Sequence, residues 1–126
     1  MKKPLIPLKV WIILREDITY TYNRILNIGL NSSYLIEGTE EYNEWRKRNI
    51  TKTYMTFNLD YLYQKETYLI NNGIKFEWIY ENKVPVGIIT HPTRKYLTDN
   101  ILRYSLTLEE YSKHHISLLI NEIEEK

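Results

Sequence analysis

Six polar side chains could do chemistry if the fold gathers them at one edge of a sheet. In chain order they are Arg15, Asp17, Arg24, His91, Thr93 and Arg94. An imidazole that is oriented by a carboxylate can act as a general base, and we assign these catalytic roles to His91 and Asp17. Guanidinium groups donate hydrogen bonds in a planar fork that suits the oxygens of a phosphate. The other four residues are therefore predicted to bind a phosphate-bearing ligand.

A plainer interpretation of the same residues is also open. Arg15 and Asp17 can form a local ion pair, and His91 can stabilise the turn that follows its strand. A hydrolytic triad lacks an evident nucleophile, because Ser32 and Ser33 lie within a predicted helix and not on the sharp turn that exposes a catalytic serine. The residues therefore support either a site or a set of structural contacts.

Metal and cofactor chemistry receive no support from the sequence. There is no cysteine, which excludes thiol catalysis and thiolate metal ligands. His114 and His115 are adjacent on a predicted helix, so their side chains cannot both face one ion. We therefore predict that the chain has no metal site and needs no cofactor.

Apolar runs and helical patterns predict the elements that position these residues. Residues 8–14 are nearly all apolar over the length of a strand, which favours a central strand buried on both faces. Asn58 and Gly73 have the residue types that begin and end a helix. The remaining elements are strands over 52–58, 74–80 and 84–90, and helices over about 21–38, 58–72, 94–103 and from 108 toward the C-terminus.

The order of these elements predicts an α/β fold in a single domain over residues 1–126. The order is β-α-β-α-β-β-α-α, which implies a four-stranded mixed sheet with helices on both faces and an added C-terminal helix. A right-handed crossover makes the first two strands parallel. The short polar turn over 81–83 makes the last two strands an antiparallel hairpin.

The overall charge limits the partners. The formal net charge is +1, so no net field draws the chain onto DNA or an anionic membrane, and neither is expected as a partner. Pro4 and Pro7 interrupt the N-terminal segment, so we predict no secretory leader and a cytoplasmic location. Twelve tyrosines and no alanine indicate an A/T-rich coding sequence, and a bacterial, phage or plasmid origin is our hypothesis.

Two segments carry a resemblance to a known family. Arg15-Glu16-Asp17-Ile18 follows the first apolar strand, Arg24 lies near the start of the next helix, and residues 86–92 form an apolar strand that ends in His-Pro. These features resemble the class II peptidyl-tRNA hydrolases and an uncharacterised bacterial branch, in which the first strand leads into Arg-x-Asp-Leu and a glycine-lysine pair. The resemblance covers roughly residues 9–108. It implies that the first and last strands are neighbours, and we expect their carboxyl ends to lie side by side.

Several positions depart from the family pattern. Asn23 and Arg24 stand where the family has a glycine and its functional lysine, and Ile28 and Asn31 stand where it has glutamine and histidine. A guanidinium stays protonated and cannot act as a general base. The family's Asp-Ala-Gly segment is replaced by residues 81–83. We therefore expect a non-catalytic or weakly active binding protein of this type, with a phosphate-bearing ligand, RNA or a protein as its partner. The alternative is a hydrolase of peptidyl-tRNA or a related ester.

Two further segments suggest partners. The basic run over 45–49 can meet an RNA backbone while Trp45 or Tyr42 stacks on a base, or it is a solvated turn that Trp45 anchors in the core. Apolar residues recur three and four apart over more than half the circumference of the predicted C-terminal helix. We hypothesise a homodimer with Ile116 and Ile120 in its shared face. The alternative is a helix that folds onto its own domain.

Overall fold

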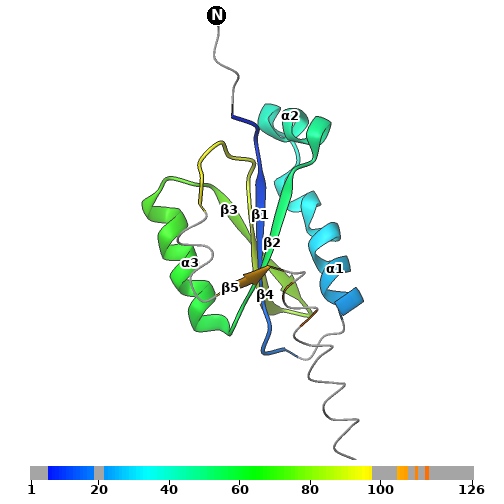
Figure 1. Cartoon of the computed structure of the whole chain (residues 1–126), viewed down its shortest axis with the longest axis vertical. Helices are drawn as coiled ribbons and strands as arrows, with labels where there is room; N and C mark the ends of the chain where they lie inside the picture. Colours follow the sequence, from blue (N-terminus) through cyan, green and yellow to red (C-terminus); the bar gives the residue numbers. More distant parts are fainter. Residues whose placement is uncertain (1–5, 19–21, 98–104, 108–109, 111–112, 114–126) are drawn as a thin grey trace, which may run out of the picture.

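The computed structural model describes residues 6–18, 22–97, 105–107, 110 and 113, and the described chain forms an α/β structure (Figure 1). A five-stranded sheet separates α3 on one face from α1, η1 and α2 on the other. In chain order the elements are β1 (Val10–Arg15), α1 (Tyr22–Asn31), the 3-10 helix η1 (Ser32–Ile36), α2 (Glu40–Arg48), β2 (Thr51–Thr56), α3 (Leu59–Asn71), β3 (Phe76–Glu81), β4 (Val84–Thr90) and β5 (Ser105–Thr107). None of the described helices is both long enough and apolar enough to span a membrane.

The sheet is mixed, as the sequence predicts, but it has one strand more than expected. Its strand order is β3-β4-β1-β2-β5. β1 and β2 are parallel, and β3 and β4 form an antiparallel hairpin, which confirms both predicted pairings. The additional strand is β5, which pairs antiparallel with β2 from Ser105 to Thr107. A segment of three residues gives too little pattern to be recognised as a strand before its partner is known.

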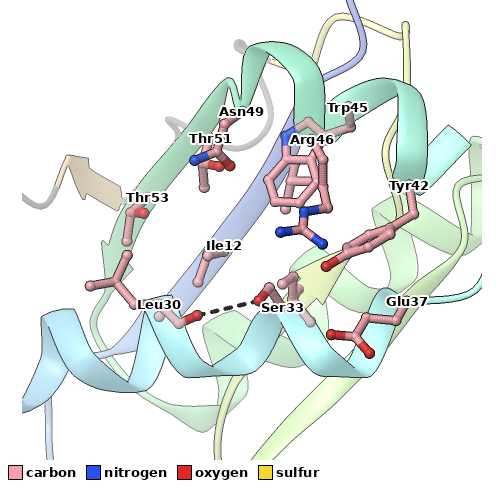
Figure 2. Close-up of a pocket in the computed structure, with 13 residues that line it drawn as sticks. Ile12, Leu30, Ser33, Glu37, Tyr42, Trp45, Arg46, Asn49, Thr51 and Thr53 are labelled. Atoms are coloured by element: carbon pink, nitrogen blue, oxygen red, sulfur yellow. Dashed lines mark hydrogen bonds between the residues drawn. The ribbon is translucent and has the colours of Figure 1, made fainter.

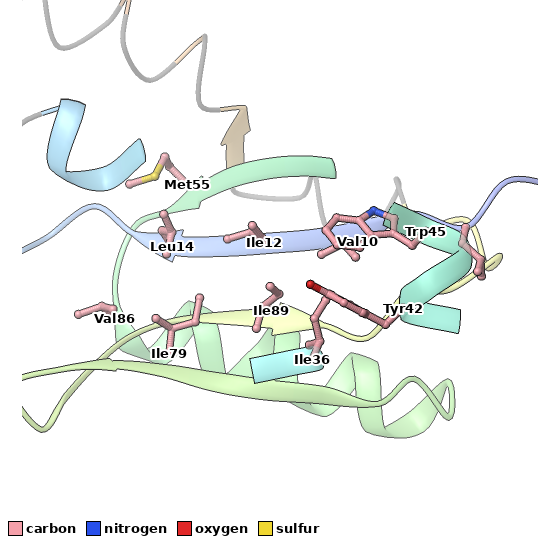
Figure 3. Close-up of a cluster of buried hydrophobic side chains, with 11 residues drawn as sticks. Val10, Ile12, Leu14, Ile36, Tyr42, Trp45, Met55, Ile79, Val86 and Ile89 are labelled. Atoms are coloured by element: carbon pink, nitrogen blue, oxygen red, sulfur yellow. The ribbon is translucent and has the colours of Figure 1, made fainter. Parts of the chain in front are cut away.

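β1 is the central strand, and both of its faces are buried. Because side chains alternate along a strand, Val10, Ile12 and Leu14 pack on the side of α1 and α2 (Figure 3). Trp11 and Ile13 pack on the side of α3. All five side chains are buried, which confirms the prediction of a strand enclosed on both faces.

α3 begins and ends at the predicted residues. The Asn58 side chain accepts a hydrogen bond from the backbone N–H of Tyr61 at 3.2 Å, and Gly73 adopts a φ of 67° just beyond the helix. The spacing of residues in this helix predicts an apolar face formed by Leu59, Leu62, Tyr63, Glu66, Leu69 and Ile70. This prediction is partly wrong, because Tyr63 and Ile70 are 48% and 60% exposed. The buried positions are Leu62, Lys65 and Leu69. The helix is therefore rotated toward Lys65, a charged residue that a hydrophobic pattern does not select.

The hairpin between β3 and β4 is closed by Asn82 and Lys83. Both residues have positive φ, and Glu81 pairs with Val84 on either side of them. A two-residue loop with this backbone matches the twist of the strands that it joins. The predicted polar turn at this position is therefore confirmed.

The segments that flank the sheet depart from the expected pattern in two places, at the end of the first predicted helix and over residues 94–97. The apolar spacing of this segment predicts Leu30, and Ser33 or Tyr34, on a buried face, but Leu30 and Tyr34 are 66% and 65% exposed. After Asn31 the chain tightens into η1, and this change of helical phase turns Tyr34 outward. Residues 94–97 are not helical, and the rest of the helix predicted over 94–103 lies outside the described residues. The Thr107 hydroxyl accepts a hydrogen bond from the N–H of Glu110 at 3.1 Å, as expected for a helix start. Most of the predicted C-terminal helix, including Ile116 and Ile120, also lies outside the described residues.

Candidate functional site

The direction of β4 separates the residues that the sequence placed in one site. β4 is the neighbour of β1, but the pair is antiparallel, with Leu14 opposite Gly87 and Ile12 opposite Ile89. The carboxyl end of β1 therefore lies beside the start of β4. The expectation that the two carboxyl ends lie side by side is wrong, because it took the two strands to run in the same direction.

The carboxyl end of β1 holds Arg15, Asp17 and Arg24. Arg15 donates to both carboxylate oxygens of Asp17, at 2.7 and 2.8 Å, and its third nitrogen donates to the carbonyl of Pro85 at 3.2 Å. These hydrogen bonds from Arg15 lower the pKa of the Asp17 carboxyl below its ordinary value. Arg24, in the first turn of α1, forms an ion pair with Glu81 at the end of β3. The local ion pair of the plainer interpretation is therefore present.

The opposite end of the sheet holds His91, Thr93 and Arg94. The backbone of Thr93 pairs with Lys9 just before β1, so these residues lie beside the amino end of that strand. His91 Nε2 lies 3.3 Å from a carboxylate oxygen of Glu77, and Arg94 donates to both carboxylate oxygens of Glu44 at 2.7 and 2.8 Å.

The structure does not bring Asp17 and His91 together, and it gives neither a role in a shared site. The backbone N–H of His91 donates to the carbonyl of Lys75 at 2.9 Å, so this residue also holds the turn after β4. Each of the three predicted arginines pairs with one carboxylate. Arg15 pairs with Asp17, Arg24 with Glu81, and Arg94 with Glu44. Among the residues that the structure describes, no cluster of ligating side chains could hold a metal ion.

A pocket of about 520 Å³ lies elsewhere, between α1, η1, α2 and the first half of β2 (Figure 2). Its floor is the sheet face formed by Val10, Ile12 and Ile89. Its volume lies within the range of about 300–1,000 Å³ that is typical of small-molecule sites. Its walls are formed by Gly29, Leu30, Ser33, Glu37, Tyr42, Trp45, Arg46, Asn49, Thr51 and Thr53.

The local sequence explains why α2 forms one wall. The Thr39 hydroxyl accepts a hydrogen bond from the backbone N–H of Tyr42 at 3.1 Å at the start of α2, and Asn49 ends the helix in the left-handed conformation. Acidic residues lie in the first turn of α2 and basic residues in the last, as the helix dipole favours. Asn49 then turns the chain into β2, so that Thr51 and Thr53 lie beside Val10 and Ile12 of β1.

Arg46 is the one basic residue among those that line the pocket, and Glu37 is the one acidic residue. The Arg46 guanidinium lies over the ring of Tyr42, with its carbon 5.8 Å from the ring centre, and points into the pocket (Figure 2). Within the described part of the chain, no carboxylate forms an ion pair with Arg46. This distinguishes Arg46 from Arg15, Arg24 and Arg94.

The two aromatic rings of α2 are too buried to stack on a nucleic-acid base. Trp45 and Tyr42 are 5% and 7% exposed, and the indole N–H of Trp45 donates to the carbonyl of Ile50 at 2.8 Å. The interpretation in which Trp45 anchors the basic run in the core is therefore confirmed. The stacking role suggested for Trp45 or Tyr42 in RNA binding has no exposed ring to support it.

Sequence reasoning singled out Arg46 and Asn49 only as part of a basic run, and it missed Thr51 and Thr53. The sequence held one signal for these two residues. Thr51 and Thr53 lie two apart, so they share one face of a strand that is predicted to pair with the apolar run of β1. Two hydroxyl groups beside two buried aliphatic side chains indicate a half-polar sheet face. The pocket itself depends on where α1 and α2 cross that face, which alternation does not specify.

Neither a comparison with models of known protein families nor a comparison with curated protein sequences finds a match to this chain.

Proposed function

We propose that this chain is a non-catalytic binding domain of the peptidyl-tRNA hydrolase II-like type, and that a phosphate-bearing ligand occupies the pocket beside Arg46. The proposed kinship is supported by the adjacency of β1 and β4, which the family resemblance implies. It is also supported by the mixed sheet and by the position of Arg24 in the first turn of α1.

The proposal that catalysis is absent is supported by the distribution of the titratable groups. A general base must lie within hydrogen-bond reach of the proton that it removes. His91 and Asp17 lie at opposite ends of β1, and Arg24, which replaces the family lysine, cannot give up its proton at neutral pH. The Asp17 carboxylate already accepts two hydrogen bonds from Arg15.

The observation that carries the binding proposal is that Arg46, at the pocket, has no carboxylate partner among the residues that the structure describes. A guanidinium without a carboxylate partner can donate a forked pair of hydrogen bonds to a phosphate. Arg15, Arg24 and Arg94 would first have to exchange their carboxylates for a ligand. Of these four arginines, Arg46 is therefore the one at which anion binding costs least.

The catalytic part of the proposal is tested with a purified peptidyl-tRNA substrate. We expect no turnover above the uncatalysed rate from the wild-type chain. Robust turnover that Asp17→Asn abolishes would contradict the proposal and would restore the hydrolase alternative. Turnover that Asp17→Asn leaves unchanged would point to a contaminating hydrolase in the preparation, and the assay would then be repeated with protein purified from a strain that lacks that hydrolase.

The binding part of the proposal is tested by calorimetry with inorganic phosphate, nucleotides and a short single-stranded RNA. We expect at least one of these probes to bind, and we expect Arg46→Gln to weaken that binding. Arg48→Gln is the matched control, because Arg48 is an exposed basic residue of the same helical turn that does not line the pocket. If none of the probes binds, or if the two variants weaken binding equally, the proposed site is wrong.

A further inference from the structure

We infer that the pocket beside Arg46 takes a nucleoside monophosphate, with the phosphate on Arg46 and the base against the exposed side chain of Leu30. This inference rests on the proposed function and narrows its ligand class. Its evidence is the chemistry of the residues that line the pocket and the single cation among them.

The charges of the lining residues favour one phosphate. Among the described residues, Arg46 is the one cation that lines the pocket, while the neighbouring Lys47 and Arg48 do not line it. Glu37 places a carboxylate on the same pocket (Figure 2). A second or third phosphate would meet Glu37 without a further cation to neutralise it. The same carboxylate can accept hydrogen bonds from the hydroxyl groups of a ribose, as acidic residues do in dinucleotide sites.

The walls of the pocket favour a nucleoside over simpler phosphate esters. Leu30 lines the pocket and is 66% exposed, so it offers an apolar surface to the flat face of a base. Hydroxyl and amide groups of Ser33, Asn49, Thr51 and Thr53 line the walls and suit the polar edge of a base and a ribose. A sugar phosphate would leave Leu30 in contact with water, and an alkyl phosphate would leave the hydroxyl and amide groups of the walls without partners.

The shape of the site favours a single nucleotide over a polynucleotide. Single-stranded RNA is bound on exposed aromatic platforms along a groove of positive charge. Here Tyr42 and Trp45 are buried in the core, and only Arg46 of the basic run reaches the pocket. A pocket of about 520 Å³ is large enough for one nucleotide within the usual range of small-molecule sites.

The test is a calorimetric comparison of five probes on the wild-type chain. The probes are adenosine monophosphate, uridine monophosphate, adenosine, ribose 5-phosphate and hexyl phosphate. We expect the two monophosphates to bind, and the three probes that lack the phosphate, the base or the ribose to bind about tenfold more weakly or worse. Adenosine loses the charge-assisted hydrogen bonds to Arg46, ribose 5-phosphate loses the burial of the base, and hexyl phosphate loses the hydrogen bonds to the walls. Each loss weakens binding by about that factor.

Three variants locate the site. Arg46→Gln should weaken the binding of a monophosphate about tenfold or more, whereas Arg48→Gln should change it by less than about twofold. Thr53→Val removes a wall hydroxyl at nearly constant volume and should weaken monophosphates while leaving hexyl phosphate unchanged. Thermal melts of all three variants check that each one folds.

The outcomes separate this inference from the proposed function. If ribose 5-phosphate or hexyl phosphate binds as tightly as adenosine monophosphate and depends on Arg46, the inference is wrong but the proposed function stands. The same holds if RNA binds while the monophosphates do not. If adenosine binds as tightly as its monophosphate, Arg46 is not a phosphate ligand and both are wrong. If none of the phosphate-bearing probes binds, both are wrong.

Discussion

The carboxyl end of β1 and the pocket beside α2 both carry arginine, yet they differ in charge pairing and in space. At the end of β1, Arg15 and Arg24 each engage a carboxylate, and the backbone of Gly87 lies directly against Leu14. At the pocket, Arg46 has no carboxylate partner among the described residues, and Gly29 lines the pocket with room for a Cβ atom in ordinary contact. The comparison teaches that the type of a residue suggests a site, whereas its partner and the space around it decide whether a ligand can enter.

Both regions depend on β1, so the first prediction concerns that strand. Ile13 is fully buried in the cluster on the α3 side. We expect Ile13→Ala to lower the free energy of unfolding by about 2–5 kcal/mol, because it removes buried methyl groups and leaves a cavity. Urea denaturation followed by circular dichroism measures the loss. A loss below about 1 kcal/mol would mean that β1 is not the central support of either region.

Alanine substitutions at Gly87 and Gly29 compare the space around the backbone in the two regions. A Cβ atom added at Gly87 would lie 2.5 Å from both the carbonyl oxygen of Ile13 and the Cδ2 of Leu14. A Cβ atom added at Gly29 would lie 3.9 Å from the Cδ1 of Ile12, which is an ordinary contact. We expect Gly87→Ala to destabilise the fold by about 1–3 kcal/mol through overpacking. We expect Gly29→Ala to be neutral or to stabilise it by up to about 1 kcal/mol, because alanine favours helix.

The same denaturation experiment measures both glycine variants. If Gly29→Ala destabilises as much as Gly87→Ala, the wall that α1 provides is tightly packed and the pocket is not open there. If Gly87→Ala is neutral, the close approach of β4 to β1 is not the constraint that we describe.

The ion pair of Arg15 and Asp17 predicts a small effect that depends on pH. The hydrogen bonds from Arg15 lower the pKa of Asp17 from its ordinary value of 3.8. The carboxylate therefore contributes stability above that pH, and this contribution is lost as the pH falls through the lower pKa of the folded state. Because the pair is partly exposed, we expect Asp17→Asn to cost only about 0.2–1 kcal/mol at pH 7.

The control for this prediction is the same pair of proteins near about pH 3, where the difference in unfolding free energy should shrink. A cost that stays constant between the two pH values would show that the ion pair is not its source. A cost of several kcal/mol at pH 7 would show that Asp17 has a larger structural role than a surface ion pair.

Much of the fold could be predicted because its signals are local. The apolar run of β1, the cap at Asn58, the stop at Gly73 and the turn over 81–83 are each set by a few neighbouring residues. The strand β5 and the burial of Lys65 could not be predicted in this way. Both depend on which distant segment packs against them, and β5 is recognisable only through its pairing with β2.

The site was harder to predict because it depends on strand direction. His91 and Asp17 each follow an apolar run, and the sequence is the same whether those two strands are parallel or antiparallel. The hairpin fixes β4 relative to β3, but it does not fix either strand relative to β1. The pocket depends in addition on the tightening of the chain into η1 and on the left-handed Asn49 after α2. Neither feature can be recognised from the spacing of hydrophobic residues in the sequence.

The central claim is that ligands bind beside Arg46 and not at the carboxyl end of β1. The most direct measurement is a titration of the isotopically labelled chain with adenosine monophosphate, followed by the amide signals in nuclear magnetic resonance spectra. The account predicts that the largest changes fall on Arg46, Asn49, Thr51 and Thr53, while Asp17 stays unchanged. Changes centred on residues 15–17 and Arg24, with Arg46 unaffected, would contradict it.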